Sequence, residues 1–127
     1  MSSSPADNVL IPQHFGSLVY VRRSHEYLPY DHLTTKILRF ARRGSIRDLP
    51  PELGRQIPSE NLRAFHRLGK RLGFLDRRGR FRGWEIAADP PSSHLLGPLT
   101  LHLALTQGCN LRCRHCFAAP EMEHADH

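Results

Sequence analysis

The order of the expected elements, with strands first and then helices and a hairpin, predicts an α+β domain over residues 8–86. This order is winged-helix-like, and three observations predict it. Runs rich in β-branched and aromatic residues open the chain. Apolar residues at helical spacing follow, and a glycine-containing turn comes after them. A cluster of Pro and Ser in residues 87–98 then marks a linker, and a second unit is expected over residues 99–127.

Strands are expected in residues 9–22, where residues 16–22 are rich in β-branched and aromatic side chains. Ser24 suits a turn, and residues 25–29 then suit a returning strand. Pro29 ends that strand or places it at a sheet edge, because proline has no N–H to give to a second ladder.

The first helix is expected over residues 32–43. Asp31 is a suitable N-cap, because its carboxylate can accept a hydrogen bond from an orphan N–H of the first turn. The apolar residues of this segment fall on one face, and Gly44 supplies a C-terminal stop. The proline-rich stretch that follows allows at most one short helix, at residues 51–55.

The strongest helix is expected over residues 60–72, with Ser59 as its N-cap and Gly73 after its end. Leucine and phenylalanine form its apolar stripe. Four basic side chains gather on the opposite face: Arg63, Arg67, Lys70 and Arg71. Residues 74–86 then predict a hairpin that turns near Gly79.

The formal net charge is +6 with neutral histidines, a surplus that suits either nucleic acid or an acidic peptide partner. No apolar run is long enough to span a bilayer. The first residues contain no basic residue followed by an apolar core, which a secretory signal has. We therefore expect a cytoplasmic protein with no membrane partner.

All three cysteines lie close together, as Cys109, Cys113 and Cys116 in a C-x-x-x-C-x-x-C spacing. Before them, leucines alternate with Thr, His and Ala over residues 99–106, which predicts a strand of an α/β sheet. Clustered thiols in a reducing compartment favour metal ligation over disulfides. Thiolate sulfur suits iron–sulfur clusters and zinc.

Residues 106–117, Thr-Gln-Gly-Cys-Asn-Leu-Arg-Cys-Arg-His-Cys-Phe, resemble the cluster loop of radical S-adenosylmethionine (SAM) enzymes that modify peptides and proteins. The resemblance implies a 4Fe-4S cluster held by Cys109, Cys113 and Cys116, with one iron left open for S-adenosyl-L-methionine. It also implies that His115 lies near the adenine of SAM, at a position that is usually aromatic. An electron donor such as a flavodoxin or ferredoxin is a further implied partner.

The chain ends at His127, shortly after the cysteines, whereas a complete (β/α) barrel needs ~200–250 residues or more. The sequence therefore predicts the first strand and the cluster loop of an incomplete α/β radical SAM barrel. We expect a truncated chain that is inactive alone, and we assign it no catalytic residue. The intact protein would be an enzyme that modifies a ribosomally synthesised peptide by radical chemistry.

Residues 18–81 resemble the peptide-recognition element of ribosomal-peptide maturation systems, which is similar to the small peptide chaperone of pyrroloquinoline quinone biosynthesis. The resemblance implies that a precursor (leader) peptide adds a strand to an exposed edge formed by His25, Tyr27 and Leu28. The peptide would also pack against the helix at residues 60–72. The basic face of this helix either attracts an acidic leader or is a solvated face.

A winged-helix iron–sulfur or zinc-containing transcriptional regulator is the alternative. Its third helix would enter the major groove of DNA, and a basic wing would touch phosphate. The basic residues of that wing are Arg77, Arg78, Arg80 and Arg82. Such regulators space their cysteines more widely, which ranks nucleic acid below a peptide as the partner. Zinc would need a fourth ligand, His102 or His124, because structural zinc sites have four protein ligands.

Overall fold

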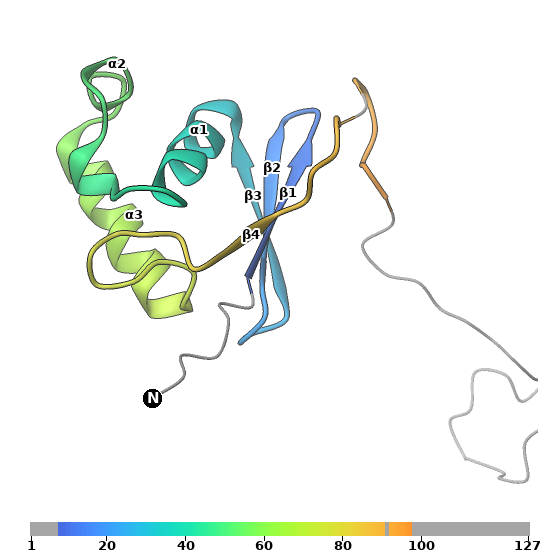
Figure 1. Cartoon of the computed structure of the whole chain (residues 1–127), viewed down its shortest axis with the longest axis horizontal. Helices are drawn as coiled ribbons and strands as arrows, with labels where there is room; N and C mark the ends of the chain where they lie inside the picture. The colour runs from blue at the N-terminus through green and yellow to red at the C-terminus, as the bar shows by residue number, and fades with distance from the viewer. Residues whose placement is uncertain (1–7, 91, 98–127) are drawn as a thin grey trace, which may run out of the picture. The chain divides into compact units, whose positions relative to one another are not determined.

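Three consecutive strands, four helical segments and a fourth strand make up residues 8–90 and 92–97, the part of the chain that the computed structural model describes (Figure 1). These residues belong to one unit, Met1–Gly97. In chain order the elements are β1 (Asn8–Gln13), β2 (Gly16–Val21), β3 (Glu26–Asp31), α1 (His32–Ala41), the 3-10 turn η1 (Ile46–Asp48), α2 (Pro51–Gly54), α3 (Ser59–Leu72) and β4 (Gly83–Glu85). The expected α+β class is confirmed.

The strands form an open sheet in the order β3-β2-β1-β4. The first three strands make an antiparallel meander, in which Leu10 pairs with Val19 and Val19 pairs with Leu28. A two-residue turn joins β1 to β2. Gly16 follows it with a φ of 141°, a value that glycine adopts readily and other residues rarely do. The strands expected in residues 9–22 are therefore present.

β3 is the edge strand on one side of the described sheet, because it pairs only with β2. It runs from Glu26 to Asp31 and passes through Pro29, so the returning strand starts one residue later and ends two residues later than expected. Alternate residues of an edge strand direct their backbone groups away from the neighbouring strand. Pro29, which has no N–H, suits such an outward position.

The core lies between one face of the sheet and the helical layer (Figure 1). Val19 and Val21 of β2 are fully buried there, as are Leu38 of α1 and Phe74 after α3. Alternation along β2 places Val19 and Val21 on the same face, and that face is covered by helices. Burial of these apolar side chains is the main stabilising term for the domain.

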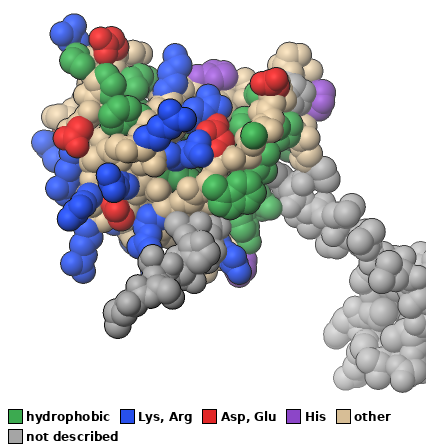
Figure 2. Space-filling model, viewed as in Figure 1, with side chains coloured by type: hydrophobic (Ala, Val, Ile, Leu, Met, Phe, Trp, Pro, Cys, Tyr) green, Lys and Arg blue, Asp and Glu red, His purple; other side chains and the backbone are tan. Residues whose placement is uncertain are grey.

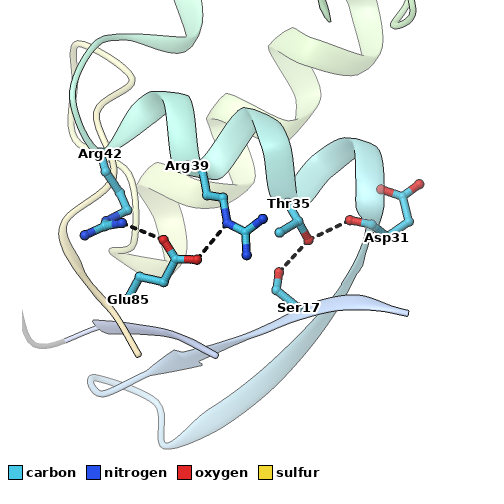
Figure 3. A network of polar contacts seen from close by, with 6 residues as sticks. All are labelled: Ser17, Asp31, Thr35, Arg39, Arg42 and Glu85. Atoms are coloured by element: carbon cyan, nitrogen blue, oxygen red, sulfur yellow. Dashed lines mark hydrogen bonds and ion pairs between the residues drawn. The ribbon is translucent and has the colours of Figure 1, made fainter. Parts of the chain in front are cut away.

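α1 starts as expected, because the Asp31 side chain accepts a hydrogen bond from the backbone N–H of Thr34 at 2.7 Å. The next turn is tied to the sheet through the buried Thr35 hydroxyl. That hydroxyl donates to the Asp31 carbonyl oxygen at 2.7 Å and lies 2.7 Å from the Ser17 hydroxyl of β2 (Figure 3). The cap and this link fix the angle at which the chain leaves β3.

α3 differs from the expectation at its start. Ser59 is the first helical residue and Pro58 takes the N-cap position, with no side-chain cap hydrogen bond. The fixed φ of proline already favours the entry into a helix, so the serine is not needed as a cap. The end agrees with the expectation, since Gly73 terminates the helix in the left-handed conformation at φ 92°.

The expected hairpin over residues 74–86 is only partly correct. The chain does turn near Gly79, and the bridge between Leu75 and Phe81 is antiparallel. The returning segment, however, leaves this bridge and forms β4, which pairs in parallel with β1. Two ion pairs bind β4 to α1: Glu85 contacts Arg39 at 2.7 Å and Arg42 at 2.5 Å (Figure 3). This non-local pairing replaces the second strand of a simple wing.

Residues 87–90 and 92–97, the described part of the expected linker, contain no helix or strand. Two contacts connect them to the end of β1 and to the β1–β2 turn. The Leu96 N–H donates to Gln13 Oε1 at 2.8 Å, and His14 Nδ1 lies 3.4 Å from the His94 carbonyl oxygen. Among the described residues, no helix is long and apolar enough to cross a membrane.

Candidate functional site

The residues expected to bind a peptide lie on two neighbouring elements, β3 and α3, and on the turn before β3. Tyr27 and Leu28 belong to β3, whereas His25 precedes it in the β2–β3 turn. The basic residues of α3 are all exposed: Arg63, Arg67, Lys70 and Arg71. Cys109, Cys113, Cys116 and His115, the expected cluster ligands and SAM contact, lie outside the described residues.

His25 and Tyr27 both contribute to the outer face of the sheet, the face that the helices do not cover. The Tyr27 ring lies 5.0 Å from the Tyr20 ring, measured between centroids, and His25 Nδ1 lies 2.9 Å from the Tyr20 hydroxyl oxygen. His25 has a positive φ of 57°, a conformation that turns allow more readily than strands do. His25 is therefore a turn residue.

Leu28 points to the opposite face, because side chains alternate along a strand. It is half-buried and packs against the core, next to Val19 in the ladder. A peptide added to β3 would therefore meet Tyr27 on one face of the sheet and Leu28 on the other. The expected edge residues are not one continuous patch.

Tyr30 is the β3 residue that reaches α3, and the sequence reasoning missed it. Its ring packs edge-on against Phe65 of α3 at 5.6 Å and lies 6.1 Å from Phe74, while Phe65 and Phe74 are 5.9 Å apart. Burial raises the pKa of the Tyr30 hydroxyl to about 12, so the phenol is neutral at physiological pH. We call these three residues the aromatic junction.

The apolar stripe of α3 is only half covered by the core. Leu62, Phe65 and Leu72 pack against it but remain half-buried, and Gly69 is the one buried residue of this helix. A Cβ on Gly69 would lie 2.5 Å from a methyl carbon of Leu75, so the glycine permits close approach of the following chain. α3 thus rests on the core through Gly69, while Phe65 of its half-buried stripe meets Tyr30 of β3.

The basic face of α3 is divided between two hollows. Arg63 lines a hollow of about 360 Å³ together with Ile46, Leu62 and His66. Lys70 and Arg71 line a larger concavity of about 830 Å³ at the other end of the helix. Arg67 lines both. Figure 2 shows Lys and Arg side chains gathered on the side of the molecule that carries α3.

The described residues contain no group of three or more His, Cys, Asp or Glu side chains that could hold a metal ion. The cysteine trio, for which the sequence predicts an iron–sulfur cluster or zinc, lies outside this part of the chain.

No family model matches the sequence, and comparisons with curated proteins and with solved structures find no match. Function must therefore be inferred from the residues of the site. An edge strand, an aromatic junction and a half-covered helix stripe lie together, and they offer main-chain hydrogen bonding beside apolar side chains. Such a combination can hold an extended chain.

Proposed function

We propose that the described domain binds a leader peptide as an added strand on the outer edge of β3, beside α3. One observation carries the proposal: β3 is an edge strand, and its Tyr30 packs directly on Phe65 of the half-covered α3 stripe. Strand addition gives affinity through main-chain hydrogen bonds, while pockets for alternate side chains give selectivity.

The two sides of β3 offer apolar surfaces on which side chains of such a peptide could pack. Peptide residues that point toward the helical layer would lie over Phe65 and Leu72, which are half-buried and already packed against the core. Residues that point the other way would meet Tyr27, a residue that is 37% exposed. A strand with alternating apolar residues therefore fits this edge better than a uniformly polar one.

The test is selection of ligands from a displayed library of random 20-residue peptides against the full chain. We expect peptides with a β-prone apolar segment to be enriched and to bind in solution, as measured by fluorescence anisotropy. A library that yields no peptide binder would contradict the proposal.

We further propose that the intact protein is a radical SAM enzyme that modifies the bound peptide. Cys109, Cys113 and Cys116 would hold a 4Fe-4S cluster, and His115 would lie beside the adenine of SAM. Bound together, the cluster and SAM supply one-electron chemistry that removes hydrogen from an unactivated carbon. The role of the described domain would be to hold the peptide near that chemistry.

Metal analysis and the visible spectrum of the anaerobically reconstituted chain test the cluster. We expect about four irons for each chain and a brown chromophore, because the cluster implied by the cysteine spacing is of the 4Fe-4S type. Bound zinc without a chromophore would contradict the cluster and favour the zinc alternative, in which His102 or His124 completes the site.

DNA binding is the second candidate function, and one observation favours it. Arg77, Arg78 and Arg82 of the loop after α3 line the same concavity as Lys70 and Arg71 of the helix. Helix and loop could together follow a phosphate backbone. A salt titration on duplex DNA separates the two functions, because duplex binding that is tighter than peptide binding, with a steep salt slope, would favour the regulator.

A further inference from the structure

A concavity of about 830 Å³ at the C-terminal end of α3 carries an unusual concentration of positive charge. Six arginines and one lysine line it, and they come from three segments: the β2–β3 turn, α3 and the loop after α3. They are Arg23, Arg67, Lys70, Arg71, Arg77, Arg78 and Arg82. We call this feature the basic concavity.

The charge of the basic concavity is not compensated within the described residues. The one acidic residue in its lining is Asp76, whose carboxylate accepts the backbone N–H groups of Arg78 and Arg80, each at 2.8 Å. That carboxylate therefore shapes the turn. The ion pairs of Glu85 go instead to Arg39 and Arg42. In the described chain, none of the seven cations forms an ion pair.

Seven like charges around one hollow repel one another and create a local positive potential that attracts anions. The fold holds them together despite this repulsion, and the Asp76 turn fixes the backbone of Arg78, one of the seven. Arginine dominates the set, and its planar guanidinium binds carboxylate and phosphate oxygens in pairs. The hollow therefore suits a ligand with several adjacent negative charges.

The position of the concavity connects it to the proposed peptide site. Arg23 belongs to the turn that leads into β3, and the concavity extends from there to α3. A peptide that lies along β3 and continues past Glu26 would enter it. A duplex fits less well, because α2 spans only Pro51–Gly54 and is too short to serve as the first helix of a helix-turn-helix across a DNA backbone.

We infer that the basic concavity binds a run of Asp or Glu residues that adjoins the strand-forming segment of the same peptide. This inference rests on the proposed peptide-binding function and names the class of its substrate, an acidic leader. The side of the apolar segment on which the acidic run lies shows whether the added peptide runs parallel or antiparallel to β3. An antiparallel peptide would carry the run on its C-terminal side, and a parallel peptide would carry it on its N-terminal side.

The experiment compares two triple variants of the full chain in selections from the random 20-residue peptide library. The test variant, R67Q/K70Q/R71Q, removes three cations from the concavity. The matched control, K36Q/R43Q/R55Q, removes the same number and kinds of charge from exposed positions outside it. Both variants lower the net charge equally, so a general charge effect changes them alike.

Wild type and control are expected to enrich peptides with a run of Asp or Glu on one side of an apolar β-prone segment. The test variant is expected to keep the apolar segment and to lose the acidic run. Affinity for one wild-type-selected peptide should fall about tenfold in the test variant at low salt, and little in the control. A far-UV circular dichroism spectrum establishes that each variant is folded.

Three results would overturn the inference. If wild type and test variant enrich the same peptides, the concavity does not select acidic residues. The proposed peptide binding would then still hold. If the library yields no binder at all, the proposed function fails together with the inference. If a 20-base-pair duplex of mixed sequence binds wild type more tightly than the selected peptide and loses affinity in the test variant, the concavity is a nucleic-acid site.

Discussion

Asp31 shows how one side chain connects two elements. It ends β3 and caps α1, and its carboxylate accepts the N–H of Thr34 at 2.7 Å. Hydrogen bonds from the backbone and the side chain of Thr34 lower the pKa of Asp31, because they favour the charged form. The effect on stability follows from the sign of the shift. The ionised Asp31 carboxylate stabilises the folded state fully above the unfolded-state pKa. This stabilisation is lost as the pH falls through the lower native pKa.

We expect Asp31→Ala to lower the free energy of unfolding by about 1 kcal/mol at pH 7, which is the usual effect of losing an N-cap. Asp31→Asn is the matched control, since asparagine caps helices as well but carries no titrating carboxyl. Urea denaturation at pH 7 and at about pH 3 would measure both. The asparagine variant should lose less stability than wild type on acidification. An equal acid-side loss would contradict the role assigned to this carboxylate.

The roles of single residues are predicted correctly from the sequence where they depend on neighbouring residues. The Asp31 cap and the Gly73 stop depend on residues next to them in the chain, and both are present. Ser59 was misassigned because Pro58 competes for the same position, and proline fixes its backbone without any hydrogen bond. Tyr30 was missed because its importance comes from Phe65, a residue distant in the sequence.

At the scale of elements, the contact between β3 and α3 is the centre of the proposed site. The two are joined by the aromatic junction of Tyr30, Phe65 and Phe74 rather than by hydrogen bonds. Aromatic pairs in edge-on geometry stabilise by ~0.5–1.5 kcal/mol beyond the area they bury. The junction therefore holds α3 at a fixed distance from the edge of β3 while leaving the helix stripe half exposed.

We expect Phe65→Ala to weaken the binding of a library-selected peptide about tenfold or more, because it removes the apolar wall beside β3. The substitution also creates a partial cavity, so stability should fall by about 1–3 kcal/mol, less than for a fully buried phenylalanine. Leu49→Ala is the control, as Leu49 is likewise half-buried against the core but precedes α2. Equal losses of affinity in the two folded variants would show that Phe65 acts only through stability.

The pairing of β4 marks the limit of prediction from sequence at this scale. The turn at Gly79 was predictable, since the residues that make it are local. The parallel ladder with β1 was not, because it joins Asn8 to Gly83 across most of the domain. No local pattern distinguishes a returning hairpin strand from one that pairs elsewhere, and the ion pairs of Glu85 with α1 favour the second arrangement.

At the scale of the whole molecule, two parts of the chain have two proposed tasks. The described domain contains the proposed peptide edge and the basic concavity. The cysteine trio, in the second unit Pro98–His127, supplies the proposed metal ligands. The metal site at the trio stays a prediction that rests on the spacing of three close cysteines. The concavity was only half predicted, because Arg23 reaches it from the β2–β3 turn and no spacing rule connects that turn with α3.

This division predicts that the two tasks can be separated. Cys113→Ala should abolish the brown chromophore of the reconstituted chain, because a cluster with two protein ligands is not held. Peptide affinity should stay within about twofold of wild type, since β3 and α3 do not contain the cysteine. His124→Ala is the control and should keep the chromophore. A Cys113→Ala variant that retained the cluster would refute the ligand assignment.

The proposed function requires that a peptide extends the sheet at β3. A proline scan of one library-selected peptide, with binding to the full chain measured by fluorescence anisotropy, tests this claim most directly. Proline removes an N–H, and only alternate residues of an added strand direct their N–H groups toward β3. Strand addition predicts large losses of affinity at every second position across the bound segment, with small losses at the positions between them. Losses that follow a helical spacing, or that occur only at acidic positions, would contradict strand addition.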